Sequence, residues 1–143
     1  MEPFCYRATV VRIVDGDTIR LDIDLGFDVI LKNQSVRLYG VDTPECRTSD
    51  LKDKAAGLLA KNVVKEFIDQ GSVVTIKTIL DDKGKFGRIL GTIVDEKGVN
   101  INHYLIDNAY AVEYYGQSKD DIQTSHQKNY QILVERGELD SNI

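Results

Sequence analysis

The alternation of apolar and polar side chains over residues 18–24 is the feature that most constrains how this chain can fold. Ile19, Leu21 and Ile23 alternate with charged residues, and a period of two is typical of a strand with one buried face. Strands are predicted at residues 6–14, 18–24, 35–41, 73–79 and 88–94, with a long hairpin connection at 26–33. Because no repeated βαβ units separate these strands, the pattern favours a small α+β barrel.

Three helices are expected to pack on this barrel. Ser49 or Asp50 can cap a helix that runs to about residue 70, where Gly71 supplies a stop signal. A short helix is predicted at about 100–108, and Ser118 can cap a last helix that ends at about residue 136. The apolar faces expected for the two long helices consist of Ala55, Leu59, Val63 and Phe67, and of Ile122, Tyr130 and Leu133.

The length of 143 residues suits a single domain with a real core. We expect one domain over residues 1–143, with its core at about 6–115 and a C-terminal helix at about 118–136. No long apolar run predicts a membrane span, and the first residues lack the pattern of a secretory signal. These features favour an intracellular, cytoplasmic monomer, with a plasmid- or virus-encoded protein as a hypothesis.

Acidic residues stand where two of the predicted strands begin and end, in the segments DGDT at 15–18 and VRLYGVDTPE at 36–45. Asp17 and Asp42 supply carboxylates and Thr43 a carbonyl, and hard cations such as Ca²⁺ prefer oxygen ligands of these kinds. A turn of this composition is often only a turn, but the combined set predicts a site for one Ca²⁺, with Mg²⁺ or Mn²⁺ as alternatives.

Three further residues complete a set suited to phosphodiester hydrolysis. Glu45 can take a proton from water, a step typically worth about 10²–10⁴-fold. Arg37 and Arg88 stay charged and can grip phosphate oxygens, where stabilisation of developing charge is usually the largest catalytic contribution. The alternative interpretation is that these arginines only pair with carboxylates on the strands.

The motifs, taken together and in this order, resemble those of the thermonuclease family, the staphylococcal-nuclease-like domains. The matching stretches are VDGDTIRL at 14–21, VRLYGVDTPE at 36–45 and KFGR at 85–88. The likeness spans about residues 6–115. It implies a five-stranded OB-type β-barrel with about three packed helices. It also implies Ca²⁺-dependent hydrolysis of DNA and of RNA, with low sequence specificity.

The resemblance also implies roles for individual residues. Asp17, Asp42 and Thr43, the last through its carbonyl, would be the calcium ligands, and Glu45 the general base or water-orienting group. Arg37 and Arg88 would contact the phosphate and stabilise the transition state, whereas Lys85 and Tyr115 resemble the family's phosphate-binding and base-side residues. The chain departs from the family at Phe86, where Tyr is frequent, and in a longer stretch at 24–35.

The net charge of −5 argues against a non-specific DNA binder, because such proteins usually displace counterions with a basic surface. A local basic rim could still form from Arg37, Arg47, Lys83, Lys85 and Arg88, so we expect weak binding with strong salt dependence. The alternative function is a catalytically silent OB-type module that binds nucleic acid or protein. Such modules usually lose a ligand, the base or an arginine, and all of these remain here.

The other conspicuous residues have plainer interpretations. Cys5 and Cys46 are expected to be free thiols, as is usual inside cells. His103 and His126 show no ligand spacing and are interpreted as ordinary helix residues. Tyr115 is favoured for base contact over Tyr110 and Tyr114. The last helix is expected to serve packing, with docking of a partner as the alternative.

Overall fold

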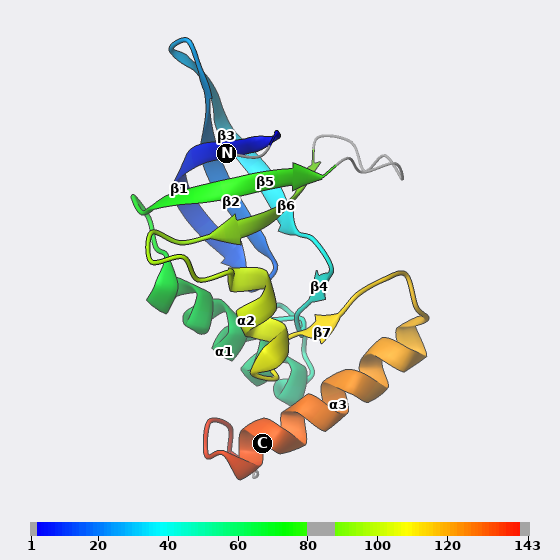
Figure 1. The fold of residues 1–143 in the computed structure, drawn as a ribbon. Helices are drawn as coiled ribbons and strands as arrows, with labels where there is room; N and C mark the ends of the chain where they lie inside the picture. The colour runs from blue at the N-terminus through cyan, green and yellow to red at the C-terminus, as the bar shows by residue number, and fades with distance from the viewer. Residues whose placement is uncertain (1–2, 80–87, 141–143) are drawn as a thin grey trace.

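The structure is a computed structural model that describes residues 3–79 and 88–140. Its strands are β1 (Cys5–Asp15), β2 (Thr18–Gly26), β3 (Val29–Leu38), β4 (Val41–Asp42), β5 (Val73–Ile79), β6 (Arg88–Val94) and β7 (Val112–Glu113). Its helices are α1 (Leu51–Phe67), α2 (Ile101–Asp107) and α3 (Lys119–Glu135). Figure 1 shows the barrel in the upper half of the molecule, with the three helices below it.

The barrel is closed in the order β1-β2-β3-β6-β5, and β4 and β7 form a separate two-stranded sheet. Neighbouring barrel strands are antiparallel except β3 and β6, which are parallel. The predicted five-stranded OB-type α+β fold is therefore confirmed. The barrel interior is filled by the alternating residues of each strand, and Ile19, Leu21 and Ile23 of β2 are almost completely buried.

The helix starts follow from their caps. The Asp50 side chain accepts hydrogen bonds from the backbone N–H groups of Lys52 and Asp53 at the start of α1, and that of Ser118 accepts from Asp121 N–H at the start of α3. Side-chain acceptors at these positions satisfy donors that have no partner within the helix. No helix in the described ranges is both long and apolar enough to cross a membrane.

The buried face of α1 differs from the predicted stripe. Of the predicted residues only Val63 is fully buried, and the buried set is Ala56, Gly57, Ala60, Val63 and Val64. The reason is close packing: a Cβ at Gly57 would lie 2.5 Å from the carbonyl oxygen of Pro44 and 2.8 Å from the backbone nitrogen of Cys46. The contact of α1 with the loop after β4 is therefore made by small residues. The apolar face predicted from the large residues lies next to this contact and is not the most buried face of the helix.

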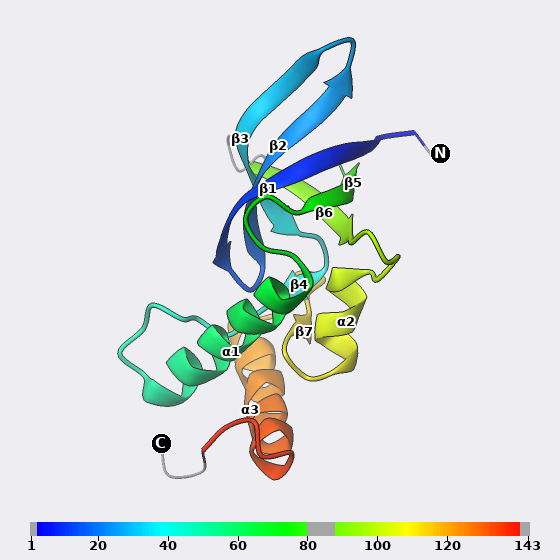
Figure 2. The same ribbon diagram turned by 90° about the vertical axis from the view of Figure 1, so that its left-hand side faces the viewer.

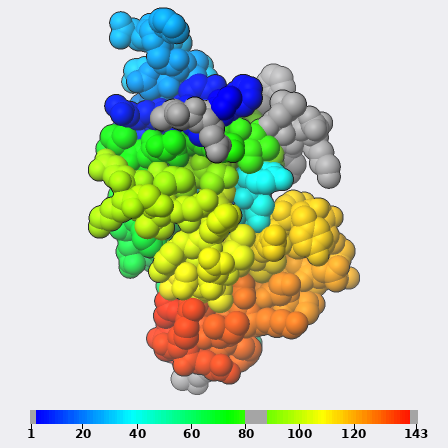
Figure 3. Space-filling model, in the orientation of Figure 1, coloured from blue at the N-terminus to red at the C-terminus, as the bar shows by residue number. Residues whose placement is uncertain are grey.

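The predicted connection at 26–33 is also corrected. β3 already begins at Val29, so most of this stretch is strand, and the turn consists of Phe27 and Asp28 with φ values of 55° and 60°. Two consecutive left-handed residues give the twist that suits a two-residue hairpin. The hairpin projects from the barrel, as the ribbon and space-filling views show (Figures 1 and 3), and Phe27 at its tip is 100% exposed.

Candidate active site

A cleft of about 560 Å³ lies between the barrel and the start of α3. Five of the predicted site residues line it, namely Arg37, Asp42, Thr43, Glu45 and Arg88. They come from β3, β4, the following loop and the first position of β6. The fold thus brings segments that are distant in the sequence to one edge of the barrel.

Alternation in β3 places Arg37 at this edge. Val36 and Leu38 point into the barrel and are buried, so the arginine between them faces outward. The N–H of Leu38 donates a hydrogen bond of 2.8 Å to the carbonyl oxygen of Asp17. This bond joins the turn at 15–18 to the end of β3, and the two acidic motifs therefore meet.

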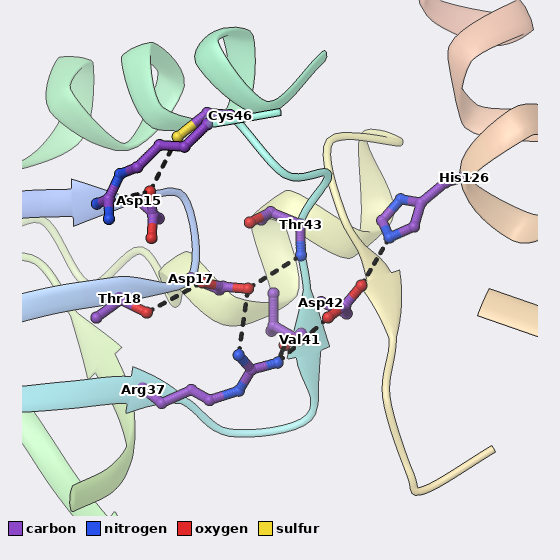
Figure 4. Close-up of polar contacts among 10 residues, drawn as sticks. Asp15, Asp17, Thr18, Arg37, Val41, Asp42, Thr43, Cys46 and His126 are labelled. Carbon is purple, nitrogen blue, oxygen red and sulfur yellow. Dashed lines mark hydrogen bonds and ion pairs between the residues drawn. The ribbon is translucent and has the colours of Figure 1, made fainter. Parts of the chain in front are cut away.

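Arg37 lies between two carboxylates, as Figure 4 shows. Its Nη1 is 3.5 Å from Oδ2 of Asp17, and its Nη2 is 3.3 Å from Oδ1 of Asp42. The backbone N–H of Thr43 also donates to Oδ2 of Asp17, at 3.3 Å. The guanidinium carbon of Arg37 is 5.8 Å from the centre of the Tyr114 ring, close enough for a cation–π contact. One arginine therefore organises both of the predicted acidic ligands.

His126 of α3 reaches the same site. Its Nε2 is 2.7 Å from Oδ2 of Asp42, and the residue is only 7% exposed. The interpretation of His126 as an ordinary helix residue therefore missed a contact with a predicted metal ligand. Its spacing from Ile122 and Tyr130 was the available signal, because position 126 falls on the same face and a buried imidazole needs a polar partner.

Glu45 and Arg88 flank the cleft in different environments. Glu45 is exposed, and its Oε1 accepts a hydrogen bond of 3.0 Å from the N–H of Arg47. The Nε of Arg88 is buried and has no hydrogen-bond partner within 3–79 and 88–140. A buried donor without a partner costs about 1–3 kcal/mol, and more when charged. An anion bound in the cleft could remove this cost.

The structure describes only one of the two residues assigned to substrate contacts. Lys85 lies outside the described residues, as do Lys83 and Phe86. Tyr115 is 80% exposed and lines a separate hollow with residues of α2 and α3. Tyr114 is the tyrosine that lines the cleft, because pairing of Val41 with Glu113 brings the end of β7 to it. The base-side role of Tyr115 stays a prediction.

Cys5 and Cys46 are free thiols, as predicted. The Cys46 thiol donates a hydrogen bond of 2.9 Å to Oδ1 of Asp15. Burial raises the pKa of the Cys46 thiol, and this hydrogen bond raises it further. A protonated, buried thiol is a poor nucleophile, and the hydrogen bond of Cys46 joins the loop after β4 to the turn at 15–18.

The donors at the site fit a hard cation. The two carboxylates and the Thr43 carbonyl are oxygen ligands, and Ca²⁺ takes additional oxygens from water or substrate. In the described part of the chain, no group of three or more His, Cys, Asp or Glu side chains is placed to hold a metal.

The fold and the cleft define a class of protein: small OB-type barrels that carry arginines and carboxylates at the edge formed by β3 and β4. Residues 35–137 match the family described as Staphylococcal nuclease homologue. The chain belongs to this family. The matched range includes every residue assigned to the cleft, whereas Asp17 precedes it.

Three relatives illustrate the likeness. The chain is 32% identical to Endonuclease YhcR of Bacillus subtilis over 115 residues, which are 77% of this chain and 9% of that protein. It is 29% identical to an uncharacterized endonuclease of Escherichia coli over 113 residues, covering 79% of this chain and 64% of that protein. A thermonuclease of Staphylococcus intermedius is 36% identical over 84 residues, 59% of this chain and 46% of that protein. The chain thus spans less than two thirds of these relatives.

Proposed function

We propose that this domain is a nuclease that hydrolyses phosphodiester bonds of DNA, and of RNA as well, with low sequence specificity. The observation that carries the proposal is the position of the Arg37 guanidinium. Its Nη1 is 3.5 Å from Oδ2 of Asp17, and its Nη2 is 3.3 Å from Oδ1 of Asp42. The cleft that Arg37 lines is also lined by Glu45 and Arg88. Membership of the family and the similarity to an endonuclease and a thermonuclease support it.

The two arginines would act on the phosphate. Arg88 Nε is a buried, charged donor without a hydrogen-bond partner among the described residues, and it is suited to a non-bridging oxygen. Such contacts are shorter and stronger than neutral hydrogen bonds. Arg37 is held by two carboxylates, so its guanidinium is already oriented before substrate binds. Preorganised donors of this kind stabilise charge as it develops in the transition state.

Glu45 would act on the attacking water. It is exposed at the rim of the cleft, and its carboxylate is fixed by the N–H of Arg47. The free oxygen of the carboxylate can therefore accept a proton from a water molecule in the cleft. Asp17, Asp42 and the carbonyl of Thr43 would hold one Ca²⁺, and when bound this ion would neutralise charge on the phosphate and orient it.

The competing function is a domain of this family that binds nucleic acid without cleaving it. The charges of the cleft argue against a nuclease, because the cationic and anionic side chains among its described residues balance and attract a polyanion only weakly. They are Arg37, Arg88 and Lys119 against Asp42, Glu45 and Asp53. The complete set of predicted catalytic groups in the cleft favours the enzyme.

Cleavage of labelled single-stranded DNA at low salt separates the two functions. Wild type is compared with Glu45→Gln in Ca²⁺ and in EDTA, and Glu66→Gln is the matched control because Glu66 is exposed on α1, outside the cleft. The nuclease predicts Ca²⁺-dependent cleavage that falls by about 10²-fold or more in Glu45→Gln and is kept in Glu66→Gln. No cleavage by wild type with any divalent ion, together with retained DNA binding, would establish the binding module.

A further inference from the structure

A second hollow, here called the basic groove, lies on the other side of the turn at 15–18 and has a volume of about 490 Å³. It is lined by Arg12, Ile13, Val14, Arg47, Lys61 and Lys65. None of these residues lines the cleft. Four of the six carry a positive charge, in a chain whose net charge is −5.

Close packing of α1 against the turn brings these cations together. A Cβ at Gly16 would lie 2.9 Å from Cβ of Ala60 and 2.9 Å from Cγ2 of Thr43, so helix and turn are almost in backbone contact. Figure 2 shows α1 beneath the lower ends of β1 and β2. Lys61 and Lys65 are four residues apart, hence on one face of α1, and this face borders β1. The groove is therefore fixed by rigid elements.

The positive charge of the basic groove is mostly uncompensated. Its acidic neighbour is Asp15, whose Oδ1 is 3.3 Å from Nη2 of Arg47. Arg12, Lys61 and Lys65 form no ion pair within residues 3–79 and 88–140. The cleft, by contrast, has balanced charges. A polyanion that reached both hollows would gain most of its electrostatic attraction in the groove.

The groove and the cleft are joined through the loop after β4. Glu45 lines the cleft and Arg47 lines the groove, and the N–H of Arg47 donates to the Glu45 carboxylate at 3.0 Å. Asp17 and Asp15 occupy the two sides of the same turn, as Figure 4 shows. A strand that leaves the cleft past Glu45 therefore meets Arg47 first, followed by the lysines of α1.

We propose that the basic groove binds the phosphates of the nucleic-acid strand beyond the bond that is cleaved. The inference rests on the proposed nuclease function and adds a substrate preference to it: strands of several nucleotides over very short ones. Binding through phosphates carries no sequence information, which agrees with low specificity. Solvated lysines without a ligand would give no dependence on strand length.

The test measures binding of single-stranded DNA of about 4 and about 16 nucleotides, lengths that bracket the usual site sizes of OB folds. It uses Ca²⁺, the Glu45→Gln background, fluorescence anisotropy and a series of salt concentrations. The groove variant is Lys61→Gln with Lys65→Gln. The control is Lys54→Gln with Lys128→Gln, since both lysines are exposed, lie on helices and line neither hollow.

For the longer strand, the groove variant is expected to lose about tenfold in affinity at low salt, and its salt slope to fall by about 1.4, roughly 0.7 per lost contact. The control pair keeps the affinity of the parent within about twofold, because it changes the net charge equally without touching the groove. Two results would overturn the proposal that the groove binds phosphates. One is an equal loss of affinity in the groove variant and in the control variant. The other is an equal affinity of the parent protein for both strand lengths. Thermal unfolding of each variant confirms that the fold is intact.

Failure of the groove and failure of the nuclease give different results. Cleavage by wild type without dependence on strand length overturns the groove and leaves the enzyme. Length-dependent binding without cleavage under any divalent ion supports the groove and overturns the enzyme. If the wild-type protein binds neither the short nor the long DNA strand, both the proposed groove and the proposed nuclease function are wrong.

Discussion

Replacement of Gly57 by alanine tests whether the contact between α1 and the active-site loop is as close as the structure indicates. Two effects oppose each other. Alanine is favoured over glycine inside a helix by about 1 kcal/mol. The new methyl group would, however, lie 2.5 Å from the Pro44 carbonyl oxygen and 2.9 Å from Cα of Cys46. Both are backbone atoms that no side-chain rotation can move away.

We expect the steric cost of the new methyl group to be larger than the gain in helix propensity. Overpacking of a tight contact typically costs about 1–3 kcal/mol. Because loop and helix must separate here, we expect the upper part of this range, about 2–3 kcal/mol, which exceeds the gain in helix propensity of about 1 kcal/mol. We expect Gly57→Ala to lower the free energy of unfolding by about 1–2 kcal/mol, which is roughly 3–8 °C in melting temperature for a domain of this size. Glu45 lies between the two clashing residues, so the proposed nuclease activity should fall as well.

Urea denaturation followed by circular dichroism measures the stability. Asn62→Ala is the matched control, because Asn62 is exposed on the same helix and gains propensity without a clash. The control should be more stable than wild type by about 0.5 kcal/mol. A Gly57→Ala protein at least as stable as wild type would show that α1 does not pack closely on residues 44–46, and the argument would be wrong.

Three further predictions concern the site and the C-terminal region. Arg88→Ala should lower kcat by about 10²–10³-fold with little loss of stability, because its buried Nε has no hydrogen-bond partner in the part of the chain that the structure describes; steady-state kinetics and urea denaturation check this. Asp17→Ala should weaken Ca²⁺ binding in a calorimetric titration, since Asp17 is a predicted ligand. Burial, together with a hydrogen bond to Glu138, raises the pKa of Tyr110 to about 12. An unfolded tyrosine titrates near about 10, so this contribution to stability is complete below that pH and is lost as the pH rises towards 12. Thermal unfolding of Tyr110→Phe should show a smaller decline over this range.

Each of these predictions has a contrary outcome. Wild-type kinetics in Arg88→Ala would remove that residue from the site. Undiminished Ca²⁺ affinity in Asp17→Ala would exclude it as a ligand. An identical alkaline decline in wild type and Tyr110→Phe would assign the decline to other groups.

The barrel was predictable because its strands carry a local signal. The strands at 73–79 and 88–94 were predicted with the bounds that the structure has. The strand at 29–33 was instead predicted as part of a hairpin connection, since Val29, Ile30 and Leu31 are consecutive apolar residues that all stay exposed. Without a buried face there is no alternation, and the pattern that defines a half-buried strand is missing.

The candidate site was predictable where its residues belong to motifs. Asp17, Arg37 and Asp42 stand at the ends of strands. Strand ends at one edge of a barrel lie close together, independently of how the rest of the chain is arranged. Tyr114 and His126 belong to no such motif, and their positions follow from the β4–β7 pairing and the docking of α3. Such contacts depend on tertiary packing, which local sequence patterns do not report.

The contact of His126 with Asp42 changes the interpretation of α3. Arg37 holds one carboxylate oxygen of Asp42 from the barrel, and His126 holds the other from the helix. The orientation of this predicted ligand therefore depends on a residue 84 positions away in the sequence. A ligand bound to the site and the docking of α3 must then be linked energetically, because each favours the same position of one carboxylate. The last helix, expected to serve packing, is also a component of the candidate site.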